Sequence, residues 1–348
     1  MIDYLNKETY NFNLPEELIA IHPTDKRDHC KLMTMSRESG AIEHKKFFNI
    51  VNYFKKGDIL VFNDSKVIPA RIFFKKETGG NVEVLLLKKI DDYTWEALLK
   101  GRKLKVGDKL FLDDICATIE EDNITTKKLK FSKILTNDVL DNIGSIPLPP
   151  YIIQSRKKNN EEEIIDDDKI VYQNVYAKRE GSVASPTSGL HFTNELIESI
   201  KNIGVEVLYI TLHVGFATFN PIKEDDLTKH NMHFEEFYID SKVADSIIKA
   251  KKENRRIISC GTTVSRVLES EYDNFSFKRL SGETNIFIYP PYKFKCVDAM
   301  ITNFHTPHST LLAMVSAFSG YNNIMNAYKI AIENNYRFFS YGDAMFMY

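Results

Sequence analysis

Six short strand-like runs that follow one another closely between residues 57 and 121 restrict the fold more than any other feature of the sequence. The segments between them contain Gly-Asp, Gly-Gly and Asp-Asp pairs, which are typical of turns between strands. The runs are GDILVF, KVIPARIFF, NVEVLLL, YTWEALL, KLFL and ATIEE. Strands spaced so closely indicate an antiparallel barrel or a small sandwich.

The chain after residue 168 has a different pattern, in which strands alternate with helices. NELIESIKNIG predicts a helix with Leu196, Ile197 and Ile200 on one face, and Gly204 suits its end. Further helices are predicted for SKVADSIIKAKKEN, VSRVLES and TLLAMVSAFSG, and strands for VEVLYITL, RIISC, TNIFIY and DAMITNF. Such alternation is typical of an α/β domain.

These two patterns together predict the fold class and the domains. QSRKKNNEEEIIDDD, residues 154–168, is polar and charged, which indicates a surface linker or a mobile loop. We expect an α/β protein whose mixed α/β main domain is built from both chain ends, residues 1–64 and 151–348. An antiparallel β-barrel domain, residues 65–150, is expected as an insertion between them.

The composition favours a globular protein of a reducing compartment. Of the 348 residues 43% are apolar and 27% charged, and the net charge of −2 gives no global basic field for nucleic acid. The four cysteines are far apart, as expected for buried free thiols. The N-terminus lacks the pattern of a signal peptide, and the best apolar run, Leu311–Phe318, is too short to span a bilayer. We expect a soluble, cytoplasmic monomer without a membrane partner.

Six of the nine histidines lie in the C-terminal half of the chain, in predicted loops or beside them. Ligands gather in an open α/β sheet where strands pass into loops and helices. His191, His213 and His305 lie at such points, and so does the turn Gly261–Thr263. We interpret EGSVASPTSGLHFT, residues 180–193, as a ligand-facing loop, because it carries little apolar material and contains one of these histidines.

Two of these loops also have a structural interpretation. The N–H groups of Gly261–Thr263 suit a phosphate or carboxylate, but a threonine at this turn suits a helix cap equally well. Gly215 and Ala217 leave room for a planar ligand between Phe216 and Phe219, or these two aromatic residues belong to the core. Both alternatives stay open from the residues alone.

Several familiar site motifs are missing from the sequence. It contains no GxSxG elbow, no GxxxxGK[ST] loop and no GxGxxG fingerprint. His230-x-x-His233-x-Glu235 invites a metal interpretation, but a zinc site needs at least three ligands and no further ligand motif accompanies it. We therefore expect no metal site.

The densest basic cluster is Lys100-Gly-Arg102-Lys103-Leu-Lys105. It lies in a segment, Arg71–Tyr151, that is close to neutral, with 14 Lys and Arg against 13 Asp and Glu. The cluster is either a phosphate clamp for RNA or a solvated hairpin, and the sequence leaves both interpretations open.

Nine stretches in series resemble the S-adenosylmethionine:tRNA ribosyltransferase-isomerase family of queuosine biosynthesis. They occur in the family's order from near residue 12 to the C-terminus. The stretches are LPEELIAIHP, GDILVFNDSKVIPAR, GNVEVLLL, VYQNVYAKREGSVASPTSGLHFT, TLHVGFATFNP, HNMHFEEF, RRIISCGTTVSRVLES, GETNIFIYPPYKFKCVDAMITNFHTPHSTLLAMVSAFSG and YRFFSYGDAM. So many matches in one order make the resemblance highly specific.

The resemblance implies a transferase activity. The family transfers and isomerises the ribosyl part of S-adenosylmethionine onto 7-aminomethyl-7-deazaguanine at the wobble position of a tRNA. Epoxyqueuosine-tRNA forms, and adenine and methionine are released. S-adenosylmethionine is therefore a consumed co-substrate, no tightly bound cofactor is implied, and the family fold is an α/β domain with an inserted β-barrel.

This chemistry suggests roles for particular residues. The sulfonium acidifies the neighbouring C5′–H, so a histidine near neutral pKa suits the general base, and charged groups and N–H donors suit the methionine end. The candidates for acid/base work are His191, His213 and His305. The candidates for substrate binding are Arg179, Glu180, Ser182, Thr187, Phe216, Gly261, Thr262, Thr263, Arg266 and Tyr292.

The sequence departs from the family pattern at a few positions. Phe216 stands where a small residue is expected and can narrow a pocket, and Pro291 replaces a usual glycine and stiffens the approach to Tyr292. Two other functions are weighed against the main hypothesis. A tRNA methyltransferase lacks support because the Gly-rich nucleoside loop is missing, and a non-catalytic RNA-binding protein is disfavoured by the near-neutral charge and the histidine-rich loops.

Overall fold

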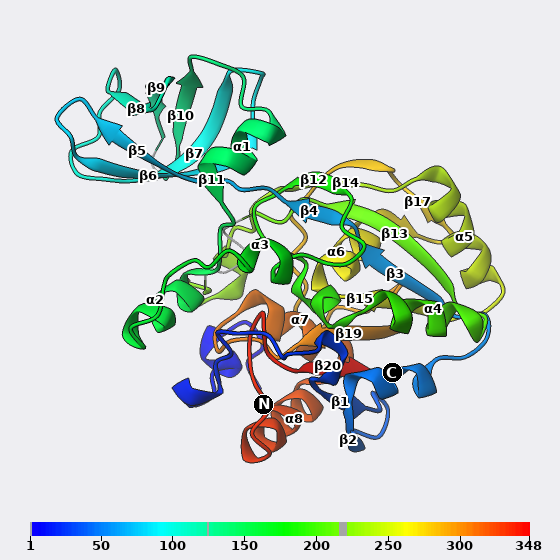
Figure 1. Ribbon diagram of the computed structural model, residues 1–348. Coiled ribbons are helices and arrows are strands. Elements are labelled where there is room, and N and C mark those ends of the chain that lie inside the picture. The colour runs from blue at the N-terminus through cyan, green and yellow to red at the C-terminus, as the bar shows by residue number, and fades with distance from the viewer. Residues whose placement is uncertain (1, 124, 216–220) are drawn as a thin grey trace. The chain divides into compact units, whose positions relative to one another are not determined.

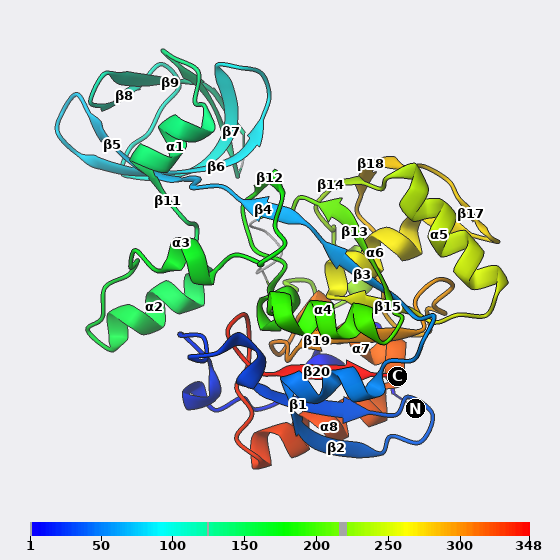
Figure 2. The same ribbon diagram turned by 45° about the vertical axis from the view of Figure 1, so that its right-hand side comes forward.

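The computed structural model describes residues 2–123, 125–215 and 221–348 of the chain. It forms two compact units (Figure 1, Figure 2). The first unit comprises Met1–Ser65, Asn174–Arg179 and Pro186–Tyr348, and the second comprises Lys66–Gln173 and Glu180–Ser185. The predicted barrel domain ends at residue 150, whereas the second unit extends to Gln173.

The second unit extends further because the segment after β11 is bonded within this unit. The side chain of Gln173 exchanges two hydrogen bonds with the backbone of Val67, at 3.0 and 2.9 Å. Helices α2 (Pro150–Lys158) and α3 (Asp168–Val171) are joined by the buried ion pair of Arg156 and Asp168 at 2.7 Å. The expected linker is therefore helical at its start and is tied down at its end.

The second unit is an antiparallel barrel. Strand β11 pairs with β5, and the order β5-β6-β7-β10-β9-β8 closes through the pairing of β5 with β8. The strands are β5 (Arg71–Lys76), β6 (Asn81–Lys89), β7 (Thr94–Lys100), β8 (Lys109–Leu112), β9 (Ile115–Asp122), β10 (Lys127–Phe131) and β11 (Gly144–Ser145), and α1 (Asn137–Ile143) follows β10. The barrel predicted from the close strand spacing is confirmed.

The first unit contains a sheet of nine strands in the order β18-β14-β13-β3-β15-β19-β20-β1-β2. Its centre, β13-β3-β15-β19, is parallel, and β1 also runs parallel to β20. The strands are β1 (Lys31–Met35), β2 (Ile42–Lys46), β3 (Ile59–Asn63), β13 (Glu206–Leu212), β14 (Glu235–Tyr238), β15 (Ile257–Cys260), β18 (Ser281–Thr284), β19 (Ala299–Asn303) and β20 (Ala344–Met347). The predicted α/β class is confirmed.

Helices flank this sheet, and short elements connect the two. The α-helices are α4 (Asn194–Asn202), α5 (Ser241–Lys252), α6 (Thr262–Glu271), α7 (Thr310–Ser319) and α8 (Tyr321–Glu333). The 3-10 helices are η1 (Lys7–Tyr10), η2 (Glu16–Leu18), η3 (Arg27–His29), η4 (Phe47–Tyr53), η5 (Thr187–His191) and η7 (Leu227–Lys229). The short strands are β4 (Ser65–Val67), β12 (Arg179–Ser182), β16 (Tyr272–Asp273) and β17 (Ser276–Phe277).

One predicted strand is wrong. TNIFIY was expected to be extended, but β18 ends at Thr284, where that run begins. Thr284 pairs with Glu235, the first residue of β14, so no partner strand remains for the residues that follow. The apolar run therefore passes out of the sheet although its composition favours a strand.

Strand alternation decides which side of the sheet each residue faces. Leu60 and Phe62 of β3 and Ile301 of β19 form one core with Leu196 and Ile200 of α4. Ser259 of β15 points to the other side, where its hydroxyl lies 2.7 Å from that of Ser265 in α6. In Figure 2, α4 accordingly lies in front of the sheet. The two helices therefore cover opposite faces.

Candidate active site

The carboxyl ends of the four parallel strands meet at one edge of the sheet, which we call the carboxyl rim. It consists of Asn63–Ser65, His213, Gly261–Thr263 and Asn303, at or after the ends of β3, β13, β15 and β19. After β3 the chain passes through the second unit and then α4 before it enters β13, and after β15 it passes through α6 before it reaches β19. Because these crossovers lie on opposite faces, the rim between β3 and β15 is a topological switch point, where open α/β sheets bind ligands.

Asn63 organises the centre of the rim. Its Oδ1 accepts hydrogen bonds from the N–H groups of Leu212 at 3.0 Å and Ser65 at 3.1 Å, and its Nδ2 donates to the carbonyl of Leu212 at 3.0 Å. The same Nδ2 lies 3.5 Å from Oγ1 of Thr263. One buried amide therefore fixes the end of β13 and connects it to the first turn of α6.

His213 follows directly and is only partly buried. Its Nδ1 lies 2.9 Å from the hydroxyl of Ser65, and its N–H donates to the carbonyl of Glu236 at 2.9 Å. Burial lowers the pKa of His213, so the ring is neutral near pH 7. When Nδ1–H donates to Ser65, the lone pair on Nε2 is available for a proton.

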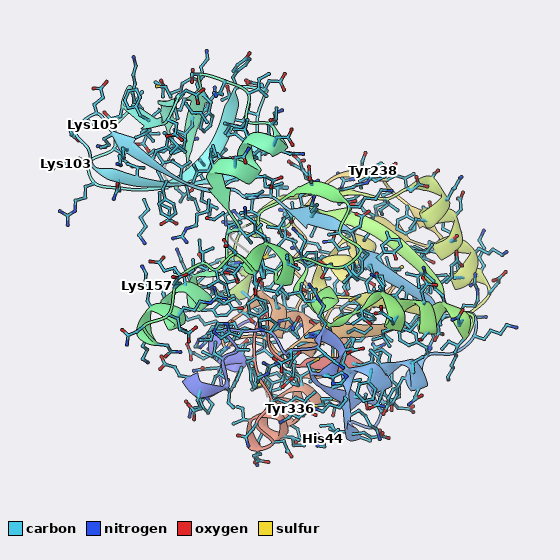
Figure 3. The ribbon with its side chains drawn as sticks, viewed as in Figure 1. His44, Lys103, Lys105, Lys157, Tyr238 and Tyr336 are labelled. Atoms are coloured by element: carbon cyan, nitrogen blue, oxygen red, sulfur yellow. The ribbon has the colours of Figure 1, made fainter. Side chains whose placement is uncertain are left out.

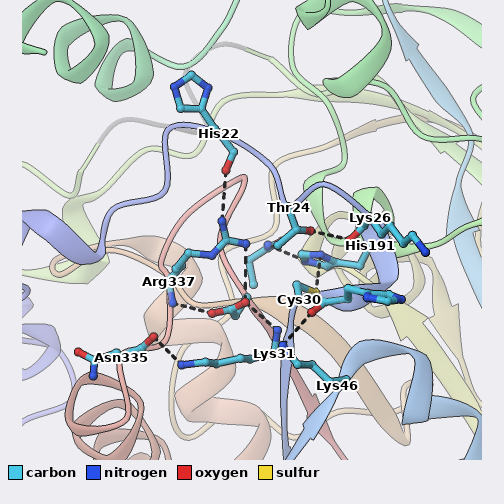
Figure 4. A network of polar contacts seen from close by, with 12 residues as sticks. His22, Thr24, Lys26, Cys30, Lys31, Lys46, His191, Asn335 and Arg337 are labelled. Atoms are coloured by element: carbon cyan, nitrogen blue, oxygen red, sulfur yellow. Dashed lines mark hydrogen bonds and ion pairs between the residues drawn. The ribbon is translucent and has the colours of Figure 1, made fainter.

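His191 lies at the same edge but is held on both sides. Asn303 Nδ2 donates to His191 Nε2 at 3.0 Å, so the ring proton lies on Nδ1, 3.2 Å from Sγ of Cys30. Figure 4 shows the ring facing Cys30. Only 4% of His191 is exposed, and burial lowers its pKa to about 3. The ring is a neutral member of a saturated network.

The same network positions η5. Oδ1 of Asn303 accepts hydrogen bonds from the hydroxyls of Thr187 at 3.1 Å and Ser188 at 3.2 Å. Ser188 in turn lies against Gly261, because a Cβ built on that glycine would come 3.4 Å from the serine hydroxyl. Thr187 and the α6 turn are thus brought to one part of the rim.

His305 is separated from His191 by the sheet itself. Successive residues of β19 point to opposite faces, so Asn303 meets His191 and Thr302 meets His305, at 3.0 Å from Nε2. The N–H of His305 donates to the hydroxyl of Tyr328 in α8 at 2.9 Å. Burial lowers the pKa of His305 to about 3. The structure does not bring these two histidines together.

The turn Gly261–Thr263 begins α6. Gly261 has φ of +94°, a conformation that favours glycine, and the helix has no side-chain cap. The first N–H groups of a helix have no partner within the helix, so this end favours an anion. Thr262 and Thr263 are buried, and the threonine cap weighed in the sequence analysis is wrong.

Arg266, one turn further along α6, lies in a cavity of about 190 Å³. Its Nη1 forms an ion pair with Glu235, each side chain is 4% exposed, and Nη2 is buried without a hydrogen-bond partner in the described part of the chain. Oε1 of Glu235 also accepts from the N–H of Gly215 at 3.0 Å, two residues after His213. Lys223 and His230 line the same cavity.

The other predicted substrate-binding residues are dispersed. Arg179 lies in the first unit with its guanidinium 3.9 Å from the ring of Tyr238, whereas Glu180 and Ser182 lie in the second unit, where Glu180 pairs with Lys66 at 2.8 Å. The hydroxyl of Ser182 donates to the carbonyl of Ala184 at 2.8 Å.

Tyr292 lies at the opposite end of β19 from the rim. Its hydroxyl donates to Glu269, at 3.1 Å, and Glu269 also accepts N–H bonds from residues 295–297, just before β19 begins. The structure therefore does not bring Tyr292 to the rim. Phe216, the remaining predicted residue, and Phe219 lie outside the described residues.

Sequence reasoning missed four residues that organise the site: Asn63, Ser65, Asn303 and Glu235. The first two belong to a polar run, Asn63-Asp64-Ser65, that directly follows the apolar strand Ile59–Phe62. Such a run after a buried strand is a signal for a rim residue. Glu235 was noticed only within the HxxHxE pattern. Its contact with Arg266 crosses 31 residues and gives no local signal.

The histidines of the HxxHxE pattern do not form a metal site with neighbouring acidic groups in the described residues. Within residues 2–123, 125–215 and 221–348, no group of three or more histidine, cysteine, aspartate or glutamate side chains is arranged to hold a metal. His230 instead places Nδ1 2.9 Å from Glu224. None of the helices in the described part of the chain combines the length and apolar character needed to cross a membrane.

Comparisons with known proteins give the same result at three levels. The family model described as queuosine biosynthesis protein matches residues 7–347. The S-adenosylmethionine:tRNA ribosyltransferase-isomerases of Thermoanaerobacter sp. (strain X514) and Fusobacterium nucleatum are 48% and 49% identical, over 98% and 97% of this chain and 99% and 96% of theirs. The crystal structure of S-adenosylmethionine tRNA ribosyltransferase from Thermotoga maritima is similar with a TM-score of 0.56 and 34% identity, over 98% of this chain and all of that one.

Proposed function

Because the chain belongs to the queuosine biosynthesis protein family, and is a transferase of tRNA modification, we propose the following reaction for it. It transfers and isomerises the ribosyl part of S-adenosylmethionine onto 7-aminomethyl-7-deazaguanine at the wobble position of a tRNA. Epoxyqueuosine-tRNA, adenine and methionine are the products. The match over residues 7–347 is the observation that carries this proposal.

His213 is the general base of this proposal. The step requires a neutral group that can take the C5′ proton beside the sulfonium, at a place that substrate can reach. His213 is partly exposed, its pKa is lowered by burial, and Ser65 holds Nδ1 at 2.9 Å. His191 and His305 are buried and already hydrogen-bonded, so we assign them to positioning: His191 orients Asn303, and His305 anchors the end of β19 to α8.

The cavity beside Arg266 is assigned to the amino-acid end of S-adenosylmethionine. That end carries one carboxylate and one ammonium. The cavity offers the carboxylate of Glu235 and a buried guanidinium nitrogen of Arg266 that has no hydrogen-bond partner among residues 2–123, 125–215 and 221–348. Its volume of about 190 Å³ exceeds the roughly 150 Å³ of a cavity that accepts benzene. The hydrogen bond from the N–H of Gly215 to Glu235 connects the cavity with a residue two positions after His213.

The anion-favouring turn of α6, with Thr187 and Ser188 beside it, is assigned to the adenine or the ribose hydroxyls. Hydroxyl and N–H donors gather there, and a leaving purine is stabilised by hydrogen-bond donors. We also expect the protein to act as a monomer in the cytoplasm, where its tRNA substrate is found.

A product assay tests the reaction. The protein is incubated with S-adenosylmethionine and a tRNA carrying 7-aminomethyl-7-deazaguanine, and digested nucleosides and small products are identified by mass. Epoxyqueuosine with equal adenine and methionine is expected. Release of S-adenosylhomocysteine would instead show a methyltransferase, and tRNA binding without adenine release would show a binding protein.

The amino-acid cavity is tested by removing both charges at once. The double variant Arg266→Met/Glu235→Met removes both members of the buried ion pair together, so the fold is expected to persist. We expect KM for S-adenosylmethionine to rise at least about tenfold, since a charge-assisted contact contributes about 1.5 kcal/mol or more. An unchanged KM in a folded variant would refute this assignment.

A further inference from the structure

One face of the barrel carries positive charge and exposed aromatic rings together. We call it the β5–β8 face, defined by Phe73, Lys75, Lys100, Lys109 and Phe111. Their side chains are exposed, while the intervening Ile72, Phe74 and Leu110 are buried, as strand alternation requires. The register places Lys75 opposite Phe111, and Phe73 and Lys100 on either side of Glu83. The residues therefore form one continuous surface across neighbouring strands.

The loop after β7 extends this face with three more cations, Arg102, Lys103 and Lys105. It is fixed in place because Nζ of Lys76 donates to the carbonyls of Arg102 at 3.0 Å and Lys103 at 2.8 Å. The N–H of Lys105 also donates to Asp108 at 3.0 Å. Figure 3 shows Lys103 and Lys105 at the outer edge of the barrel. The basic cluster therefore lies in a loop whose conformation is fixed by hydrogen bonds.

The cations of this face differ from those on the opposite strands. Lys127, Lys128, Lys130 and Lys133, on or after β10, each form an ion pair with Asp122, Glu120, Glu121 or Asp114. The six cations of the β5–β8 face and its loop form no ion pair within the described residues. They are Lys75, Lys100, Arg102, Lys103, Lys105 and Lys109. Two carboxylates lie among them, and each pairs with another cation: Glu83 with Arg71 at 2.8 Å and Asp108 with Lys76 at 3.5 Å.

The stability of the barrel does not explain why the cations of the β5–β8 face lack ion pairs in the described residues while the lysines on or after β10 have them. The segment Arg71–Tyr151 holds 14 basic and 13 acidic residues, so acids were available to pair with every lysine. Instead, cations that form no ion pair in the described part of the chain lie around Phe73 and Phe111, which are 51% and 37% exposed. Exposing large apolar rings in a row of cations is unfavourable for folding but suits nucleic acid, since cations bind phosphates and rings stack on bases.

We propose that the β5–β8 face binds the tRNA substrate: the six cations contact backbone phosphates, and Phe73 and Phe111 stack on unpaired bases. This inference rests on the proposed function, which supplies a tRNA as the partner. It extends that function because it assigns RNA binding to residues of the second unit, whereas the candidate reacting groups belong to the first unit.

A pair of matched variants tests the proposal in the full-length protein. Lys75, Lys100, Lys103 and Lys105 are changed to Gln in one variant, and Lys127, Lys128, Lys130 and Lys133 in the other. The Kd for the tRNA is measured from 50 to 200 mM salt. We expect the first variant to bind about tenfold or more weakly, with a log Kd against log salt slope lower by about 0.7 to 0.9 for each lost phosphate contact. The second should resemble the wild type.

A separate double variant tests the contribution of Phe73 and Phe111 to tRNA binding. Phe73→Leu/Phe111→Leu keeps apolar surface but removes stacking, so we expect Kd to rise about tenfold with an unchanged salt slope. Equal slopes in the two lysine variants would overturn the proposal, as would a wild-type Kd in the first. If the wild type binds tRNA but releases no adenine, the reaction proposed above fails, while the comparison of slopes still decides the role of this face.

Discussion

His191 and His213 lie at the same edge of the same sheet, but the structure surrounds them differently. The ring of His191 has Asn303 on one nitrogen and Cys30 on the other, and only 4% of the residue is exposed. The ring of His213 meets Ser65 on one nitrogen and is only partly buried. Three strand spacings separate Asn303 from His213 across the sheet, roughly 14 Å.

The difference shows why a histidine at a strand end is not by itself a catalytic group. A general base needs an unoccupied lone pair and a path for the proton, and His191 has neither. Its neutral ring instead fixes the amide of Asn303, which holds the hydroxyls of Thr187 and Ser188. The rim therefore has a rigid side built on Asn303 and a reactive side built on His213.

The largest expected effect comes from removing the imidazole of His213 on the reactive side of the rim. His213→Ala should lower kcat by about 10² to 10⁴, the usual contribution of a general acid or base. His44→Ala is the matched control, because His44 lies exposed on β2, beside Tyr336 and away from the rim (Figure 3). Adenine release at saturating substrates measures both variants. Turnover of His213→Ala within about threefold of the wild type would remove it from the mechanism.

The pH profile sharpens the same assignment. Burial lowers the pKa of His213 below its ordinary value of 6.5, so the base is neutral at and above that pH. The acidic limb of kcat/KM should therefore fall below pH 6.5, as protonation removes the lone pair. An acidic limb centred above pH 6.5 would contradict this.

Local patterns in the sequence predicted the scaffold well. Close strand spacing predicted the barrel, and the 3.6-residue periodicity of NELIESIKNIG predicted α4 with Leu196, Ile197 and Ile200 buried. These features depend on neighbours in the chain. TNIFIY failed because strand formation also needs a partner, and β14 offers none beyond Glu235.

The candidate site was predicted only in outline for the same reason. The sequence located the rim, but it could not show that His191 is saturated, since its partners lie 112 and 161 residues away. It could not separate His191 from His305 either, because that separation depends on which face of β19 each loop crosses. Burial and long-range pairing decide these roles, and neither leaves a local pattern.

A smaller effect, on stability, is expected from a substitution in η5 on the rigid side of the rim. A Cβ on Gly189 in η5 would come 1.9 Å from the hydroxyl of Tyr176 and 2.8 Å from Oδ1 of Asn174. Gly189→Ala should therefore destabilise the fold by about 1 to 3 kcal/mol, as overpacking does. Adding Tyr176→Phe removes the closest atom and should restore part of that stability. Gly80→Ala is the control, because its nearest neighbour is 3.9 Å away in the Lys76 side chain.

Thermal or urea unfolding measures these variants. A Gly189→Ala protein as stable as the wild type would show that η5 can shift to accommodate the methyl group. The side of the rim built on Asn303 would then not be rigid. In that case the hydroxyls of Thr187 and Ser188 would no longer be held in place by the backbone of η5.

The buried neutral ring of His305 changes stability only when the pH is lowered. Burial lowers the pKa of His305 to about 3 in the folded protein, whereas the unfolded chain takes up this proton near pH 6.5. The neutral ring therefore makes its full contribution to stability above pH 6.5. Between pH 6.5 and 3 the free energy of unfolding decreases by about 1.4 kcal/mol for each pH unit. His305→Gln removes this one proton, so the slope of unfolding free energy against pH should decrease by that amount. An identical slope would mean that folded His305 accepts a proton, and that the far face of β19 is more open than its contacts with Thr302 and Tyr328 indicate.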